Sequence, residues 1–194
     1  MENLTSPVRV GFCLTGSFCT FKKAIDAMER LKNGGYDIIP IMSFNAANTD
    51  TRFGTATQHI EHIEDICGRH VIRTIPEAEP IGPKNMTDVM LVAPCTGNTL
   101  AKLAHSMTDT PVVMAVKSHL RGGRPVIIAP ATNDGLAGAF KNLAMLMNYR
   151  HYYFVPFTQD DCVKKPNSLG ADLSKLEETI EAALNGVQIQ PVLV

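Results

Sequence analysis

The sequence predicts a three-layer α/β domain in which helices cover both faces of a doubly wound, mostly parallel sheet. Two observations predict this class. Short apolar runs alternate with segments whose apolar residues recur at helical spacing, and several of the runs end in small polar residues. The 194 residues suffice for one domain with its own core. We expect a single domain over residues 1–194, with its core over residues 8–156 and a helical tail over about residues 172–186.

The first half of the chain starts with a short apolar run over residues 8–15, which predicts a buried strand. Apolar residues at helical spacing follow, and Gly34 and Gly35 are expected to end that helix. A second strand is expected over residues 36–42, although Pro40 cannot donate a hydrogen bond within it. Residues 43–57 are rich in Ser, Asn, Thr and Gly, which predicts a long polar loop.

The rest of the chain continues the alternation and ends in a helix. Ser174 and Glu177 have the spacing of a capping box, which predicts the start of that last helix. The order of the elements is that of flavodoxin-like and Rossmann-like folds. We expect helices over residues 59–67, 100–107 and 136–147, strands over residues 71–75, 88–93, 111–116, 125–129 and 152–155, and an irregular segment over residues 75–85.

Composition and charge argue against several classes of function. The net charge is −1 and no stripe of basic residues is present, so a nucleic-acid partner is not expected. No apolar run approaches the ~20 residues of a membrane-spanning helix, and residues 1–7 are too polar for a signal peptide. The five cysteines are scattered without the C-x-x-C spacing of a metal or redox site. We therefore expect a cytoplasmic protein with no bound metal and no membrane anchor.

Four predicted strands end in small polar residues. Because the carboxyl ends of parallel strands meet at one edge of a sheet, and ligands of such sheets bind there, we expect these residues to line one crevice. Glycine lets the backbone approach a ligand, and a helix that starts there attracts an anion such as phosphate. The four strand ends are Thr15-Gly16-Ser17, Ser43-Phe44-Asn45, residues 93–99 and residues 129–133.

Each of these features also has a simpler structural explanation. Gly16 and Ser17 lack the remaining glycines of G-x-G-x-x-G, and by themselves they fit a turn with a helix cap. Cys95 is either a reactive thiol at a helix start or a small packed side chain. Arg52, in the polar loop, either binds a substrate carboxylate with two hydrogen bonds or is solvated.

Several motifs together resemble a known family. Residues 15–17 read T-G-S, residues 92–104 read V-A-P-C-T-G-N-T-L-A-K-L-A, and residues 128–133 read I-A-P-A-T-N. The set resembles the flavoprotein family of FMN-dependent cysteine decarboxylases and prenyl-flavin synthases, which carry P-A-S-A-N-T and P-A-M-N at the matching strand ends. The resemblance covers about residues 8–156, and Thr132 stands where the family has methionine.

The resemblance implies a bound FMN and a set of residues that contact it. No residue is assigned as the catalytic base, because no clear base lies at a strand end. The resemblance, together with the loop arginine, assigns Arg52 and Asn98 to the substrate. The cofactor-binding residues that it implies are Gly16, Ser17, Ser43, Cys95, Thr96, Gly97, Asn98 and Asn133.

Three further segments resemble one branch of the family, namely residues 11–21, 42–54 and 134–144. This branch implies an oxidoreductase subunit that works on a small dicarboxylate together with a dehydrogenase-like subunit, which brings NADP or NAD. A homo-oligomer is implied by analogy with the family. Two alternatives stay open: an independent FMN-dependent decarboxylase or flavin-modifying enzyme, and a scaffold subunit without chemistry of its own.

Overall fold

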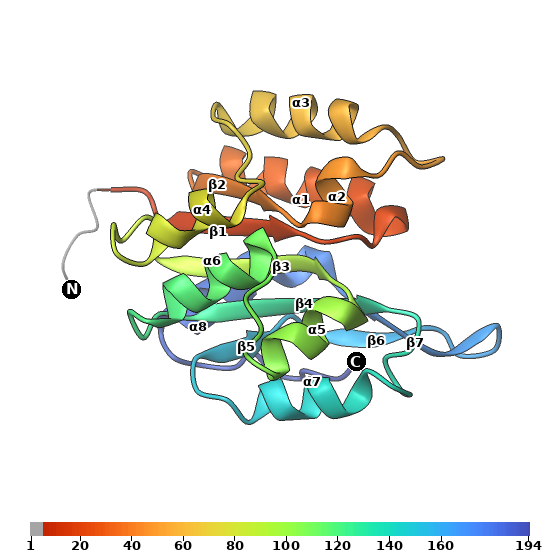
Figure 1. Ribbon diagram of the computed structural model, residues 1–194. Helices are drawn as coiled ribbons and strands as arrows, with labels where there is room; N and C mark the ends of the chain where they lie inside the picture. Colours follow the sequence, from red (N-terminus) through yellow and green to blue (C-terminus); the bar gives the residue numbers. More distant parts are fainter. Residues whose placement is uncertain (1–5) are drawn as a thin grey trace.

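The computed structural model describes residues 6–194, so residues 1–5 of the predicted polar start lie outside the described part. Its centre is a seven-stranded sheet with the order β2-β1-β3-β4-β7-β6, and β5 lies beside β4 (Figure 1). The parallel strands are β1 (Arg9–Leu14), β2 (Asp37–Met42), β3 (Val89–Cys95), β4 (Val126–Thr132) and β5 (Tyr152–Phe154). The predicted mostly parallel α/β fold is confirmed.

Helices cover both faces of this sheet because successive strand side chains point to opposite sides. Val10, Phe12 and Leu14 of β1 face one layer, while Cys13 faces the other. The first layer is built mainly from α1 (Phe21–Asn33), α2 (Phe44–Asn48), α3 (Ala56–Cys67) and α8 (Leu176–Leu184). The second layer is built from α4 (Ile75–Ala78), α5 (Gly97–Ala104), α6 (Pro111–Leu120) and α7 (Phe140–Met147). Within residues 6–194, no helix combines the length and the apolar character needed to cross a bilayer.

An antiparallel hairpin of β6 (Phe157–Asp161) and β7 (Lys165–Ala171) was not predicted. β7 pairs with Ala131 and Thr132 at the end of β4, whereas β5 pairs with the start of the same strand. β4 therefore has two different neighbours along its length. The hairpin extends past the carboxyl edge of the parallel strands (Figure 1).

The predicted strand over residues 111–116 is wrong, because this segment is the first part of α6. Thr110 caps the helix by accepting a hydrogen bond from the Val113 amide, and Pro111 occupies a position that proline favours at a helix start. Most side chains of α6 are buried. A helix buried on most sides lacks the polar face that reveals helical periodicity. The three valines of α6 are also β-branched residues, which are typical of strands.

Several predicted boundaries also need correction. The predicted loop over residues 43–57 contains α2, because the Ser43 hydroxyl accepts a hydrogen bond from the Ala46 amide and caps a short helix. The predicted strand over residues 71–75 is reduced to a single bridge between Ile41 and Ile72. Within the segment expected to be irregular, residues 75–85, the chain forms α4 and a 3-10 helix over Glu79–Ile81.

The predicted capping box at Ser174 is wrong. The side chain of Asp172 accepts a hydrogen bond from the Ser174 amide and starts a 3-10 helix over Leu173–Lys175, after which α8 begins. α7 also begins later than expected, at Phe140, because residues 133–139 form turns in which the Ala137 and Ala139 amides donate to the Asp134 carbonyl.

One fully buried histidine joins α6 to the sheet. The Nε2 atom of His119 lies 2.9 Å from the Pro125 carbonyl oxygen, and Nδ1 lies 2.8 Å from the Thr87 hydroxyl. A neutral ring that donates from Nε2 and accepts at Nδ1 satisfies both contacts. Burial is the main cause that lowers the pKa of His119 to about 4, and the positive charge of Arg124 acts in the same direction.

The buried ring predicts a pH-dependent stability. The unfolded chain takes up a proton on His119 near pH 6.5, whereas the folded chain does so only near pH 4. The free energy of unfolding should therefore fall by about 3 kcal/mol as the pH drops through this window, because the unfolded state binds the extra proton. Urea titrations at several pH values measure this effect. In His119→Gln the free energy of unfolding should no longer fall by this amount between pH 6.5 and pH 4, whereas in the exposed His151→Asn the fall should remain. Equal slopes in both variants would contradict the assignment.

Candidate functional site

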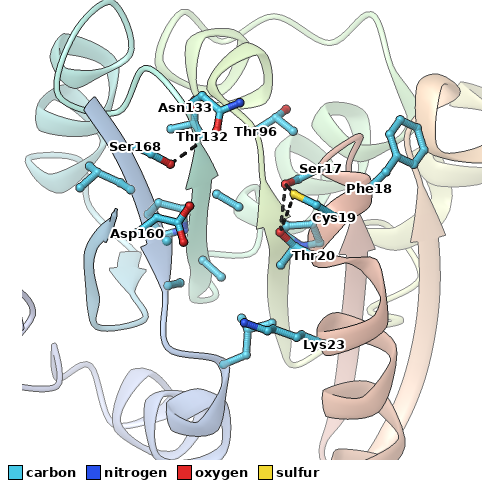
Figure 2. Close-up of a pocket in the computed structure, with 18 of the residues that line it drawn as sticks. Ser17, Phe18, Cys19, Thr20, Lys23, Thr96, Thr132, Asn133, Asp160 and Ser168 are labelled. Carbon is cyan, nitrogen blue, oxygen red and sulfur yellow. Dashed lines mark hydrogen bonds between the residues drawn. The ribbon is translucent and has the colours of Figure 1, made fainter. Parts of the chain in front are cut away.

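A wide crevice lies above the carboxyl ends of β1, β3 and β4, and its volume is about 1230 Å³ (Figure 2). One wall is the start of α1 with the turn that precedes it, and the opposite wall is the β6–β7 hairpin with the end of β4. β1 lies between β2 and β3, so β2 is added on one side of β1, and β3 and β4 are added on the other side. The order of the strands therefore reverses at β1. Ligands of doubly wound sheets bind at such a reversal, and the predicted crevice is therefore present.

The α1 wall is rich in hydroxyl groups. The Ser17 amide donates to the Thr15 carbonyl at 2.7 Å, which turns the chain out of β1 into a 3-10 helix over Phe18–Thr20 that leads into α1. The hydroxyls of Ser17 and Thr20 lie 3.1 Å apart. Lys23, one turn further along α1, points into the crevice (Figure 2). Hydroxyls, a lysine and a helix start together favour an anion at this wall.

The floor of the crevice is fixed by one buried side chain. The Thr15 hydroxyl donates to the Pro94 carbonyl at 2.7 Å and lies 3.1 Å from the Thr96 amide, from which it accepts. Thr96 then caps α5, because its own hydroxyl accepts from the Thr99 amide at 3.4 Å. Pro94 and Thr96 both line the crevice, so the first turn of α5 is held next to the end of β1.

The opposite wall comes from β4 and the hairpin. Asn133 lines the crevice at the end of β4, and its Oδ1 accepts from the Ser168 hydroxyl of β7 at 3.5 Å. Asp160 of β6 pairs with Lys165 of β7 at 2.7 Å. The hydrogen bond from Lys165 is the main cause that lowers the pKa of Asp160. Both side chains are exposed, so this ion pair contributes little to stability.

Two positive side chains at the crevice are available to a ligand. Among residues 6–194, no carboxylate lies within ion-pair distance of Lys23 or Arg52. Arg52 lies in the tight turn between Thr51 and Gly54, and its guanidinium is 4.8 Å from the centre of the Phe53 ring. The Phe53 ring orients the guanidinium at the rim, since a cation is attracted to the face of an aromatic ring.

The crevice brings together five of the nine residues that the sequence predicted for the site. Gly16, Ser17, Arg52, Thr96 and Asn133 line it. The side chain of Ser43 does not, because it caps α2 instead.

Gly97 and Asn98, predicted for the same site, line a second pocket between α5 and α7. The predicted flavin contact of the Asn98 side chain is therefore not supported at the crevice.

Cys95 also departs from the prediction. The register between β3 and β4 shifts between Val92 and Cys95, and a one-residue shift turns a side chain to the other face of the sheet. Cys95 is thus fully buried with Met90 and Val92 beneath α5 and α6. Burial raises the pKa of its thiol well above the ordinary value, so the reactive-thiol alternative is excluded in favour of a packed side chain.

Sequence reasoning missed several lining residues. Asp160, Lys165 and Ser168 belong to a hairpin for which the chain gives no clear alternation of apolar and polar residues. Lys23 could have been found, because it lies three positions after Thr20 and therefore on the same face of the helical segment as the hydroxyl. Within residues 6–194, no group of three His, Cys, Asp or Glu side chains could hold a metal ion.

Comparison with known proteins identifies the family. The family described as Flavoprotein matches residues 2–166. The chain belongs to this family. The B subunit of dipicolinate synthase from Bacillus subtilis (strain 168) is 46% identical over 186 residues, which cover 96% of this chain and 93% of that protein.

Two solved structures agree with the fold. The crystal structure of the dipicolinate synthase B subunit from Bacillus halodurans has a TM-score of 0.89 at 44% identity, and the match covers 97% of both chains. The FMN-dependent cysteine decarboxylase SpaF has a TM-score of 0.67 at 21% identity over 92% of this chain and 96% of that one. The likeness to the decarboxylase therefore concerns the fold alone.

The burial of the cysteines predicts how they react. Cys19, at the crevice, and Cys162, near the hairpin tip, are exposed, whereas the other three are buried. Burial raises the pKa of Cys67 to about 11, and that of Cys13 is also raised. Two of the five thiols should thus react rapidly with Ellman's reagent at pH 8, and all five after unfolding. Cys162→Ser should leave one fast thiol; three or more fast thiols in the folded protein would contradict the burial.

Proposed function

We propose that this chain acts as the B subunit of a dipicolinate synthase. In this proposal, it works with a dehydrogenase-like A subunit that brings NADP or NAD, and the pair oxidises dihydrodipicolinate to dipicolinate (pyridine-2,6-dicarboxylate) during sporulation. The observation that carries the proposal is the 46% identity to the Bacillus subtilis protein over nearly the whole of both chains. The crevice, which has free positive side chains at both its inner wall and its rim, supports a site for anionic ligands.

The residues of the crevice fit a phosphorylated flavin such as FMN. Ser17, Thr20 and Lys23 offer hydroxyls and a positive charge for the phosphate at the start of the helical segment. Thr96 and Asn133, from neighbouring strand ends, offer hydrogen bonds to the polar edge of the ring system. The volume of about 1230 Å³ exceeds that of an ordinary small-molecule pocket and leaves room for a second ligand. A bound flavin would supply an acceptor for a hydride.

The oxidation removes a hydride and a proton from the ring of the substrate, and NADP or NAD is reduced. This chain's part is to bind and orient the dicarboxylate. Arg52 is placed to do so, because its guanidinium is exposed at the rim, stacked on Phe53 and free of any carboxylate of residues 6–194. A planar guanidinium can hold a carboxylate with two parallel hydrogen bonds.

The proposal includes a homo-oligomer in the cytoplasm of the mother cell of a sporulating bacterium. Support for the oligomer comes from large apolar side chains that remain exposed in and beside α7, namely Leu136, Phe140, Met147 and Tyr149. Apolar side chains that gather on one exposed surface are typical of protein contacts. The location rests on the similarity to the Bacillus subtilis protein.

A flavin titration tests the cofactor part of the proposal. FMN should bind the unmodified chain, and Lys23→Gln should weaken binding about tenfold because it removes one charge-assisted contact. Lys22→Gln is the matched control, since Lys22 neighbours Lys23 on α1 but does not line the crevice. Quenching of flavin fluorescence measures both affinities. No binding at high micromolar FMN, to the lone chain and to the complex with the A subunit, would refute this part.

A reconstitution assay tests the reaction. Dipicolinate should form only when this chain and the A subunit are mixed, as followed by the absorbance of the product. Arg52→Ala should lower kcat/KM about tenfold to a hundredfold through the lost carboxylate contact. Arg150→Ala, an exposed arginine at the opposite end of the strands, should have no effect. Full activity of the A subunit alone would show that this chain is not needed for the reaction. Release of carbon dioxide from a peptide with a C-terminal cysteine would favour the decarboxylase alternative.

A further inference from the structure

Two turns project beyond the carboxyl ends of the parallel strands, one on each side of the crevice (Figure 1). The first is the Thr51–Gly54 turn between α2 and α3, and the second is the turn over residues 162–164 between β6 and β7. Phe53 of the first turn lines the crevice, as do Asp160 and Lys165 of the strands on either side of the second turn. We call the opening between the two turns the crevice mouth.

Each turn exposes a large apolar side chain. Phe53 is 45% exposed and Val163 is 84% exposed. A single apolar side chain on a surface is ordinary, but these two lie on opposite sides of one opening. Both turns are closed by hydrogen bonds, because the Phe53 amide donates to the Thr51 hydroxyl and the Val163 amide donates to Asp161 Oδ1, each at 3.1 Å. A contact on an ordered turn favours binding, since little entropy is lost when a partner covers it.

A positive side chain stands next to each of these apolar side chains. Arg52 precedes Phe53, and the exposed Lys164 follows Val163. Among residues 6–194, no carboxylate lies within ion-pair distance of either cation. Asp161, at the hairpin turn, uses its Oδ1 to accept from two amides of that turn. The crevice mouth therefore matches a surface that combines apolar side chains with carboxylates.

The chemistry of the oxidation determines which partner has to cover the crevice mouth. A hydride passes between atoms that are in contact, at about 3–3.5 Å. In the proposed function the dicarboxylate lies in the crevice of this chain, and the A subunit holds the nicotinamide. The same contact is needed if a flavin in the crevice relays the electrons. Because the strand ends lie beneath the crevice, the nicotinamide has to approach from the side to which the two turns project.

We propose that the crevice mouth is the docking surface for the nicotinamide-binding A subunit, with Phe53 and Val163 as its apolar contacts. The A subunit then surrounds its nicotinamide with apolar and acidic side chains, and Lys164 pairs with one of the acids. This docking surface rests on the proposed function, which assigns the nicotinamide to the A subunit. The exposed apolar side chains in and beside α7 remain for contacts between copies of this chain.

Val163→Asp is the decisive variant, because Val163 does not line the crevice. Binding of the A subunit loaded with NADP, measured by biolayer interferometry, should weaken at least about tenfold, since an apolar contact is replaced by a charge. Val187→Asp is the matched control, because Val187 is also exposed but follows α8 outside the crevice. The control should bind the A subunit normally, and both variants should bind FMN normally. Unchanged affinity of Val163→Asp for the A subunit would overturn the proposal.

The reconstitution assay separates docking from chemistry. Val163→Asp should raise the concentration of the A subunit that gives half the maximal rate about tenfold, while the rate at saturating A subunit should stay that of the unmodified chain. A lower rate at saturation would place Val163 in the reaction itself and overturn its docking role. Lys164→Gln should lower the association rate and its dependence on salt, whereas Lys84→Gln, an exposed lysine before β3, should change neither.

Cys162 allows a measurement that leaves the crevice mouth unaltered. Its thiol is free and exposed, and it neighbours Val163 on the hairpin turn. Alkylation of Cys162 by iodoacetamide, followed by mass spectrometry of the modified peptide, should slow about tenfold when the A subunit is present at about ten times its Kd, because only the unbound chain reacts. An unchanged rate under these conditions would contradict docking at the crevice mouth.

A second copy of this chain is the competing occupant. Sedimentation without the A subunit should give the same mass for Val163→Asp and for the unmodified chain, and a smaller mass for the variant would assign the crevice mouth to copies of this chain and overturn the proposal. The proposed function fails separately. Binding of the A subunit that Val163→Asp weakens, combined with no dipicolinate from the unmodified pair, would refute the proposed function and leave the docking surface standing. No binding between the unmodified chains would refute both.

Discussion

A single threonine at the end of β1 links the two strand ends that form the floor of the crevice. Thr15 is 1% exposed, and its hydroxyl donates to the Pro94 carbonyl and accepts from the Thr96 amide. These two bonds join the ends of β1 and β3 at the point where the strand order reverses. The turn of Ser17 before α1 and the cap of α5 both start within two residues of this link. The positions of the hydroxyl wall and of the start of α5 are therefore not independent, because the same hydroxyl is bonded to the strand end that precedes α5.

The sequence predicted the parallel part of the fold because its strands are buried on both faces. Such strands appear as continuous apolar runs, and each is followed by small residues at the ligand-binding edge. The positions of Gly16, Ser17, Thr96 and Asn133 at one crevice follow from this edge alone. Sequence could not reveal α6, since its burial removes the polar face by which a helix is recognised.

Two further errors have different physical causes. Cys95 was expected at the crevice, but an irregular register in β3 turns it into the core, and no residue type reports such a shift. The hairpin wall was missed because β6 and β7 are mainly exposed, and each contributes only one large apolar side chain, Phe157 and Leu169, to the core. Exposed strands give weak sequence signals, since a strand is recognised mainly by what it buries. The wall that carries Asp160 and Ser168 could therefore be found only from coordinates.

The position of α8 has a consequence for how the chain folds during synthesis. Leu173, Leu176 and Ile180 complete the same apolar layer as β1 and α1, and Arg30 of α1 donates to the Leu173 carbonyl at 3.2 Å. The first strand and the first helix leave the ribosome more than 140 residues before this cover exists. Until α8 emerges from the ribosome, that layer stays open to water. The growing chain therefore presents an apolar surface to chaperones. Completion of this layer thus waits for the synthesis of α8, in keeping with the slow closure of contacts that are distant in sequence.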